Sequence, residues 1–319
     1  MKAVIAGGTG FLGSALAASL RADGHDVIVL TRGPNQPSRF ALRWSAEALA
    51  EAEGSAPLRS GEVAWDPSAP TGGWTAALDG ADAVISLAGE RLDAGRWTNA
   101  RKTSILGSRV AATEALVKTM SAASHRPAVF LSASAVGVYG AHGSEALGEE
   151  SPPGADFLAS VCVAWEAAAM AAAGTTRVVL LRTGLVLDRN GGALPKLALP
   201  FKLFAGGRVG SGDQYWSWIH REDWTRMVRW AIDTPAVNGP LNLTAPGPAT
   251  NREFTRALAR ALHRPALAPA PTFALRMMLG EMADAMILIG QRVLPAKATL
   301  NGFEFRYPDL DSALRQIYQ

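Results

Sequence analysis

The chain contains 319 residues, of which 48% are hydrophobic and 18% are charged, and its formal net charge at pH 7 is +3. This composition is typical of a globular protein with an ample core. The basic residues are scattered and form no stripe with aromatic residues, which argues against nucleic-acid binding. The single cysteine, Cys162, excludes an intrachain disulfide and a cysteine-based zinc site, so we expect no metal. The start of the chain lacks a signal-peptide layout, and the apolar stretch 272–290 carries charged residues, so we expect no membrane span and a cytoplasmic location.

Short apolar runs alternate with longer helical patterns over the first 185 residues, which predicts a parallel sheet wrapped by helices. The expected strands are 2–6, 26–31, 62–65, 82–87, 127–132 and 177–182. The expected helices between them lie near 11–23, 98–121 and 157–173. Residues 33–60 interrupt this rhythm with several Pro, Gly and Ser residues, and we interpret them as an insertion in which residues 40–53 could form a helix.

The alternation becomes irregular after residue 184, which indicates a different organisation for the second part of the chain. The expected helices there are 193–204, 221–233, 251–263, 272–289 and 309–317, with short strands near 214–219 and 240–243. The sequence therefore predicts an α/β fold, in which a Rossmann-type parallel sheet is followed by a smaller, mainly helical C-terminal substrate lobe.

A glycine-rich turn joins the first expected strand to the first expected helix. Residues 8–13 satisfy the G-x-G-x-x-G pattern, and Gly7, Gly10 and Gly13 also fit a G-x-x-G-x-x-G spacing. Glycines allow a tight turn and a close approach of a pyrophosphate, and the following helix N-terminus supplies N–H groups and partial positive charge. The alternative is an ordinary glycine turn, but the strand–turn–helix context favours a dinucleotide site. The residues expected to form it are Gly7, Thr9, Gly10, Phe11, Leu12 and Gly13.

The end of the second expected strand bears on which dinucleotide is bound. An Asp or Glu there would accept a hydrogen bond from the ribose 2′-hydroxyl of NAD, but the strand ends on Thr31 and Arg32. A hydroxyl and a guanidinium suit the 2′-phosphate of NADP instead. The alternative is that Arg32 is a solvated loop residue. The sequence therefore favours NADP(H).

Other strand ends extend the expected cofactor site, because ligands of such sheets bind at the carboxyl ends of the strands. Asp66 could accept from the adenine amino group, although an exposed loop aspartate is the alternative. The small side chains at the end of the fourth strand would let the backbone pass close to the cofactor. The residues added to the site on these grounds are Leu87, Ala88, Gly89, Ser132 and Thr183.

Further motifs are spread over nearly the whole chain. They are Leu87–Glu90, Arg96–Trp97, Ser108–Arg109, Ser132–Ser134, Tyr139–Gly140, Trp165–Glu166, Leu181–Gly184, Trp218–Asp223 and the tail from Leu279 to Pro308. With these motifs the sequence resembles the extended short-chain dehydrogenase/reductase superfamily, in its epimerase and dehydratase group. More narrowly, it resembles an atypical branch that carries a C-terminal domain of unknown function. The resemblance implies a possible homodimer formed through the helices at 98–121 and 157–173.

The resemblance also implies a Ser/Thr–Tyr–Lys relay, in which a lysine lowers the pKa of a tyrosine that acts as general acid and base. Ser134 is the candidate serine, with Ser132 as the alternative, and either hydroxyl could instead bond to the backbone. When the next helix is anchored on Glu166, the tyrosine position is Leu158 and the lysine position is Cys162. The usual catalytic pair is therefore missing, as it generally is in the branch resembled.

Two side chains could replace the missing acid/base. Tyr139 follows Ser134 closely enough to reach the cleft, although a packed loop tyrosine is the alternative. Glu90 ends the fourth strand, where a salt bridge or a helix start is the alternative. Cys162 as a nucleophile is less favoured than a packed cysteine. An arginine beside an aromatic residue suits an anionic or ring-bearing substrate. The residues expected on the substrate side are Arg96, Trp97, Arg109 and His220.

Two functions follow from this sequence. The first is an NADP(H)-binding epimerase or oxidoreductase that acts on an unidentified small, perhaps anionic, substrate. The alternative is a non-catalytic NADP(H) sensor or adaptor that acts through a protein partner, for example in cell division. The expected domains are an NADP-binding Rossmann domain over 1–184 and a substrate lobe over 185–319. Residues 213–245 are expected to return to the first domain, and 265–319 form the C-terminal segment implied by the resemblance.

Overall fold

The computed structural model describes residues 1–31, 58, 60–69, 72–266 and 269–319. Arg32 and the helix predicted over 40–53 lie outside these residues. The chain forms two compact units. The N-terminal unit comprises Met1–Ala133 and Ala164–Leu180, and the C-terminal unit comprises Ser134–Val163 and Leu181–Gln319. A domain boundary at residue 184 stays a prediction.

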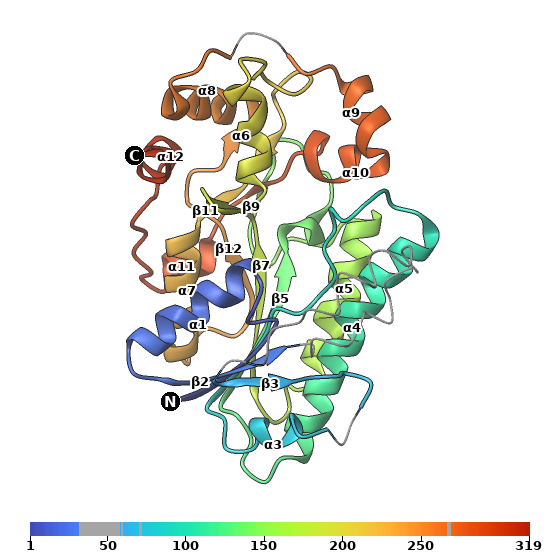
Figure 1. Ribbon diagram of the computed structural model, residues 1–319, viewed down its shortest axis with the longest axis vertical. Helices are drawn as coiled ribbons and strands as arrows, with labels where there is room; N and C mark the ends of the chain where they lie inside the picture. The colour runs from blue at the N-terminus through green and yellow to red at the C-terminus, as the bar shows by residue number, and fades with distance from the viewer. Residues whose placement is uncertain (32–57, 59, 70–71, 267–268) are drawn as a thin grey trace. The chain divides into compact units, whose positions relative to one another are not determined.

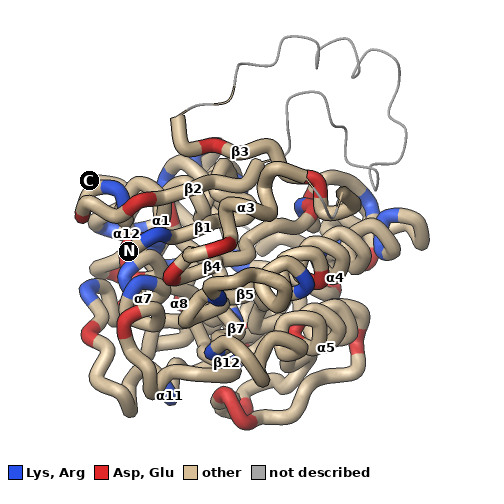
Figure 2. The backbone as a smooth tube through the Cα atoms, turned by 90° about the horizontal axis from the view of Figure 1, so that it is seen from below, with Lys and Arg blue, Asp and Glu red and all other residues tan. Residues whose placement is uncertain are grey.

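Within the described residues, seven strands form one sheet in the order β12-β7-β5-β4-β1-β2-β3 (Figure 2). The strands are β1 (Lys2–Ala6), β2 (Asp26–Thr31), β3 (Glu62–Ala64), β4 (Ala83–Ser86), β5 (Val129–Ala135), β7 (Arg177–Thr183) and β12 (Gly239–Leu243). Strand β1 pairs in parallel with β2 and β4, so that Ile5 lies between Val29 and Ile85. Parallel sheets are covered on both faces, which is why these strands are nearly continuous apolar runs. The predicted α/β class and all six strands of the first half are confirmed.

Helices cover both faces of this sheet (Figure 1). They include α1 (Phe11–Ala22), α3 (Thr75–Leu78), α4 (Asn99–Ala122) and α5 (Phe157–Met170). The hydroxyl of Thr98 caps α4 by accepting a hydrogen bond from the Arg101 amide. Leu116 and Met120 of α4 pack with Val4, Val84 and Phe130 of the strands in the core of the N-terminal unit. The helical periodicity read from the sequence therefore placed α1, α4 and α5 to within a few residues, whereas the short helix α3 was not predicted.

The C-terminal unit adds smaller sheets and further helices. Its short strands are β6 (Ala146–Leu147), β8 (Leu185–Asp188), β9 (Gly191–Gly192), β10 (Tyr215–Trp216), β11 (Trp218–His220), β13 (Ala249–Thr250) and β14 (Arg292–Val293). Its helices include η2 (Val136–Tyr139), α6 (Leu194–Lys202), α7 (Arg221–Asp233), α8 (Asn251–Leu262), α11 (Ala296–Leu300) and α12 (Leu310–Tyr318). Strand β11 pairs with β8 and β10 pairs with β13, so that of the strands between residues 214 and 243 only β12 belongs to the large sheet.

The sequence predicts one continuous helix over 272–289, and this prediction is wrong because the structure has three separate helical elements there. Gly280 adopts a φ of +61°, which ends α9 (Thr272–Leu279) and separates it from α10 (Glu281–Ala283) and the π-helical turn η3 (Asp284–Leu288). Glycine is the residue that takes such a conformation without steric cost, and apolar periodicity alone does not reveal it. None of the described helices is both long and apolar enough to cross a bilayer.

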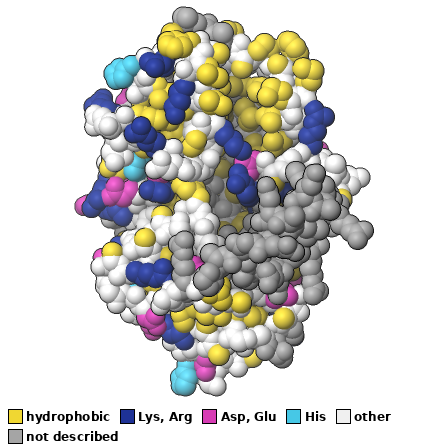
Figure 3. Space-filling model, in the orientation of Figure 1, with side chains coloured by type: hydrophobic (Ala, Val, Ile, Leu, Met, Phe, Trp, Pro, Cys, Tyr) yellow, Lys and Arg dark blue, Asp and Glu magenta, His cyan; other side chains and the backbone are white. Residues whose placement is uncertain are grey.

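Large hydrophobic side chains gather on the surface around α6 and α9 of the C-terminal unit (Figure 3). The side chains that are more than half exposed there are Leu199, Leu203, Phe204, Phe273, Met277 and Met278. Helix α9 buries none of its residues. This apolar surface is thus not part of the core of the unit that carries it.

Candidate cofactor and active site

The glycine turn between β1 and α1 packs its backbone directly against the end of β4. Gly7 has a φ of +80°, and a Cβ atom on it would lie 2.9 Å from the Ala88 nitrogen. A Cβ atom on Gly13 would lie 2.4 Å from the Gly7 carbonyl oxygen, so α1 can approach β1 this closely only with glycine at that position. The spacing of these glycines is therefore required by the packing of the turn itself.

The N-terminus of α1 has the features of an anion site. Gly10 precedes the helix with φ −75° and ψ 173°, it is exposed, and no side chain caps the helix there. The helix has 12 residues and no acidic residue in its first turn. The helix dipole and amides at such a terminus favour negative charge. The geometry of Gly7, Gly10 and Gly13 therefore fits a dinucleotide pyrophosphate.

The residues predicted to contact the adenosine half of the cofactor are only partly described. Thr31 is the last residue of β2 and is half-buried, while Arg32 lies outside the described residues. The Asp66 carboxylate accepts hydrogen bonds from the Ser68 amide at 2.8 Å and from the Ser68 hydroxyl at 2.7 Å. Asp66 therefore closes its own turn after β3, and its contact with adenine stays a prediction.

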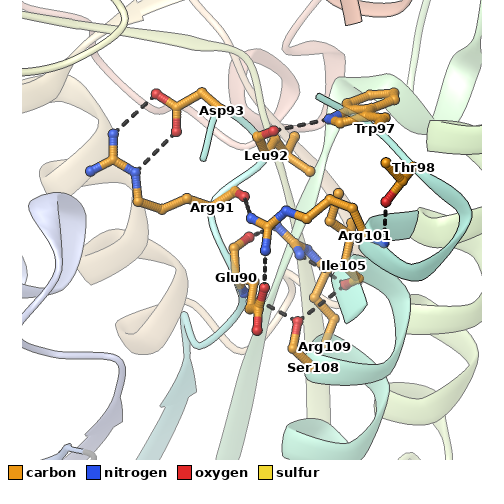
Figure 4. Close-up of polar contacts among 10 residues, drawn as sticks. All are labelled: Glu90, Arg91, Leu92, Asp93, Trp97, Thr98, Arg101, Ile105, Ser108 and Arg109. Atoms are coloured by element: carbon orange, nitrogen blue, oxygen red, sulfur yellow. Dashed lines mark hydrogen bonds and ion pairs between the residues drawn. The ribbon is translucent and has the colours of Figure 1, made fainter. Parts of the chain in front are cut away.

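Glu90, which follows β4, is tied to α4 through a network of polar contacts that we call the Glu90 network, comprising Glu90, Arg101, Ser108 and Arg109 (Figure 4). The Glu90 side chain is 9% exposed and its carboxylate forms an ion pair with Arg101. A largely buried carboxylate that is paired in this way holds the loop to the helix. The placement therefore supports the salt-bridge alternative for Glu90 rather than a role as general acid or base.

The loop after Glu90 holds the next two predicted substrate residues. The Trp97 indole donates a hydrogen bond to the Leu92 carbonyl at 2.9 Å, which fixes the ring to its own loop. Arg96 is exposed beside it. Arg109 belongs to the Glu90 network and its guanidinium donates to two backbone carbonyls, and substrate binding by Arg109 stays a prediction.

The strand-end hydroxyls are buried or already bonded. Ser132 is fully buried and its hydroxyl donates to the Ala133 carbonyl at 3.4 Å, while Ser134 is 4% exposed. The Thr183 hydroxyl donates to the Leu181 carbonyl and accepts from the Trp224 indole at 3.2 Å. Ser134 as the catalytic serine and Thr183 as a cofactor contact stay predictions.

Helix α5 carries Leu158 and Cys162 at the two positions that the resemblance assigns to the superfamily's tyrosine and lysine. Leu158 lies near Gly137, on which a Cβ atom would be 3.5 Å from the Leu158 Cβ. Cys162 is buried and packs with Val138, Leu147 and Val293. Leu158 has no ionisable proton, and Cys162 lacks the charge and the reach of an ammonium, so the buried thiol packs as a small hydrophobic residue.

Tyr139 lies in the interior of the C-terminal unit, where the exposure needed for acid/base catalysis is absent. Its hydroxyl donates to the Asn242 side chain at 2.7 Å and accepts from the Arg182 guanidinium at 3.0 Å. Burial raises the pKa of Tyr139, and the positive charge of Arg182 opposes this only in part. The phenol therefore holds its proton, and these contacts support the packed-tyrosine alternative, while a catalytic role of Tyr139 stays a prediction.

His220 caps α7, and its side chain is buried. The imidazole Nδ1 accepts the Glu222 amide at 3.2 Å, and Nε2 lies 3.0 Å from the Gln316 side-chain oxygen. This pattern requires a neutral ring with its proton on Nε2. Gln316 is 96 residues away in sequence, so no local pattern could have indicated this role. His220 thus has a structural role as a helix cap, and its expected substrate role stays a prediction.

The capping role of His220 makes a prediction about pH. Burial lowers the pKa of His220 below the ordinary value of 6.5. The neutral ring therefore stabilises the fold above about pH 6.5, and this contribution decreases as the pH falls from there through the folded-state pKa, because the unfolded chain takes up the proton first. His220→Asn keeps a capping oxygen and removes the titration. Urea denaturation at pH 7.5 and 5.5 should show a smaller loss of stability in this variant than in the wild type. A loss as large in His220→Asn as in the wild type would contradict the assignment of this capping histidine as the group that titrates.

Arg101, Ser108 and Trp165 contact Glu90 or Arg109; Ser108 and Trp165 belong to motifs that carry the resemblance, whereas Arg101 was not predicted. Arg101 and Ser108 are separated from one another by seven residues, which places them on the same face of α4 as Arg109. That spacing was a usable signal. The contact of Trp165 on α5 with Arg109 on α4 depends on how the two helices pack, and no spacing indicates it.

Comparison with known proteins agrees with this geometry. The model of the NAD dependent epimerase/dehydratase family matches residues 3–243, and a domain of unknown function, DUF1731, matches residues 270–317. The chain is 39% identical to the chloroplastic SDR39U1 homolog of Arabidopsis thaliana, covering 100% of this chain and 87% of that protein. It is 37% identical to YfhF of Bacillus subtilis, covering 99% and 98%. The crystal structure of human SDR39U1 with NADPH superposes with a TM-score of 0.86 at 33% identity, covering 100% of this chain and 99% of that one. This chain belongs to the NAD dependent epimerase/dehydratase family.

Proposed function

We propose that this chain binds NADPH through the glycine turn after β1. The observation that carries the proposal is the backbone packing of Gly7 and Gly13, which leaves the uncapped N-terminus of α1 open at Gly10. Human SDR39U1, a relative that this chain matches over 99% of its length, was crystallised with NADPH. The residues that would hold the pyrophosphate are those of the turn, from Gly7 to Gly13.

The proposal is for NADPH rather than NADH because β2 ends without an acidic residue. Thr31 closes the strand, and Arg32 follows it in sequence. An Asp or Glu at this position would favour a free ribose 2′-hydroxyl, whereas a hydroxyl and a guanidinium suit a 2′-phosphate.

The proposed activity is that of an oxidoreductase or epimerase on an unidentified small substrate. The bound nicotinamide would supply or accept a hydride, and the protein would bind and orient the substrate. Ser134 is the proposed group that orients the substrate oxygen. The acid/base partner differs from the superfamily relay, because Leu158 and Cys162 occupy its positions. General acid–base assistance is worth about 10²–10⁴-fold, so its loss is compatible with slow turnover. A homodimer through α4 and α5 and a cytoplasmic location stay predictions.

Calorimetric titration of the purified protein with NADPH and NADH tests the cofactor proposal. The wild type should bind NADPH more tightly than NADH. Arg32→Ala should weaken NADPH binding by about tenfold or more, as expected for loss of a charge-assisted bond to phosphate. NADH lacks the 2′-phosphate, so its affinity should stay unchanged and serves as the internal control. Equal losses for both cofactors would contradict recognition of the 2′-phosphate by Arg32.

If the protein binds neither NADPH nor NADH, the proposed function as a whole is contradicted. If NADPH does bind, its oxidation in the presence of a panel of carbonyl compounds, followed by absorbance, identifies the substrate class.

A further inference from the structure

Glu90 is held to α4 at three separate groups (Figure 4). Its amide donates to the Ser108 hydroxyl at 3.1 Å, its carbonyl accepts from the Arg109 guanidinium at 2.9 Å, and its carboxylate pairs with Arg101. Arg101 also donates to the Arg91 carbonyl. The loop that follows β4 is thus fixed at Glu90 by three side chains of one helix.

Arg109 is the best anchored of these side chains. One guanidinium nitrogen donates to the Ile105 carbonyl at 2.9 Å and the other to the Glu90 carbonyl. The guanidinium lies over the Trp165 ring, 5.2 Å from its centre, which is a favourable cation–π distance. Trp165 in turn donates its indole N–H to the Thr113 hydroxyl at 3.0 Å. The position of Arg109 is therefore set by α4 and α5 together.

The segment that Arg109 holds is the one that packs on the glycine turn. A Cβ atom on Gly89 would lie 3.1 Å from the Arg109 Cγ, so the side chain lies along the backbone of this segment as well as bonding to Glu90. One residue earlier, the Ala88 nitrogen is the atom that a Cβ on Gly7 would approach to 2.9 Å. A continuous path of contacts therefore runs from Trp165 through Arg109 and the β4 end to Gly7.

We infer that Arg109 is a positioning residue for the cofactor, which holds the β4 end against the glycine turn and does not itself touch a ligand. The inference rests on the proposed NADPH binding. Two of the guanidinium nitrogens already bond to backbone carbonyls and its face covers Trp165, so an anionic substrate would have to displace these contacts. A loop that is preorganised in this way binds its ligand without a further ordering cost.

The test measures the affinity of NADPH and NADH for Arg109→Met and Arg109→Lys by calorimetric titration. Methionine keeps an apolar stem along Gly89 and removes both guanidinium donors. We therefore expect Arg109→Met to lower the affinity for NADPH and for NADH by the same factor. That factor should be about tenfold, the scale of one lost hydrogen bond to a charged donor. Lysine keeps the charge and one donor at a time, and it should recover part of the affinity. The equal loss for both cofactors separates this effect from that of Arg32→Ala, which weakens NADPH alone.

Arg91→Met is the matched control, because Arg91 lies in the same loop with a side chain that is 74% exposed. It should bind both cofactors as the wild type does. Trp165→Phe keeps a ring beneath Arg109 and gives a second, milder variant that should weaken both cofactors by a smaller factor. Melting curves of the variants are recorded in parallel, and binding is measured far below the melting temperature. Under these conditions almost all of the protein is folded, so a loss of stability alone does not change the measured affinity.

Wild-type affinity in Arg109→Met would overturn the inference while leaving the proposed function standing. A loss confined to NADPH would also overturn it, since that result would place Arg109 at the 2′-phosphate. A wild-type protein that binds neither cofactor would overturn the proposed function and this inference with it.

Discussion

Gly10→Ala is expected to reduce the affinity for NADPH by about 100-fold while the protein remains folded. Gly10 is exposed and has an ordinary φ of −75°, so its backbone conformation suits alanine. The new methyl group would lie 3.3 Å from the Gly7 carbonyl oxygen, a contact that the turn can relieve by a small shift. The methyl group would, however, occupy the space through which the pyrophosphate approaches the helix N-terminus. Calorimetric titration together with a melting curve measures both effects.

Two other glycines provide controls for this substitution. Gly13→Ala places a methyl group 2.4 Å from the Gly7 carbonyl oxygen and should destabilise the fold itself. Gly73→Ala meets no atom within 4 Å and should change neither stability nor binding. Unchanged NADPH affinity in folded Gly10→Ala would exclude the glycine turn as the pyrophosphate site.

Asp223→Ala is expected to lower the free energy of unfolding by about 3 kcal/mol, because it removes one charged acceptor that is shared by three donors. Asp223 is fully buried in the first turn of α7. Its carboxylate accepts the amides of Arg306 at 2.9 Å and Tyr307 at 2.8 Å, and pairs with Arg226 at 2.9 Å. Alanine would leave two amides and a guanidinium without this acceptor. Urea denaturation measures the loss.

Glu222→Ala is the matched control, because the neighbouring acid serves the same C-terminal segment from a more exposed position. Glu222 pairs with Arg306 and accepts the Tyr307 hydroxyl at 3.3 Å, and its side chain is 35% exposed. Partly exposed ion pairs contribute up to about 1 kcal/mol, so this variant should lose far less stability than Asp223→Ala. Equal losses in the two variants would contradict the assignment of Asp223 as the buried anchor of residues 306–307.

Some residues of the candidate site could be predicted from the sequence, and others could not. Gly7, Gly10 and Gly13 were identifiable because a turn of this kind imposes its spacing on consecutive residues. The absence of an acid after β2 could be read directly for the same reason. Arg101, Ser108 and Arg109 share a face of α4 through helical spacing, but the residue they bind, Glu90, lies in a loop whose path no periodicity encodes.

The sequence by itself determined the strands of the large sheet, the long helices beside them and the glycine turn, because each leaves a periodicity or a spacing in consecutive residues. Only the tertiary structure decided the roles of the polar side chains. Tyr139 meets Asn242 across 103 residues, and His220 meets Gln316 across 96. Arg109 reaches Trp165 only because α4 packs beside α5. A buried polar group must find a hydrogen-bond partner, and long-range packing selects which one it finds.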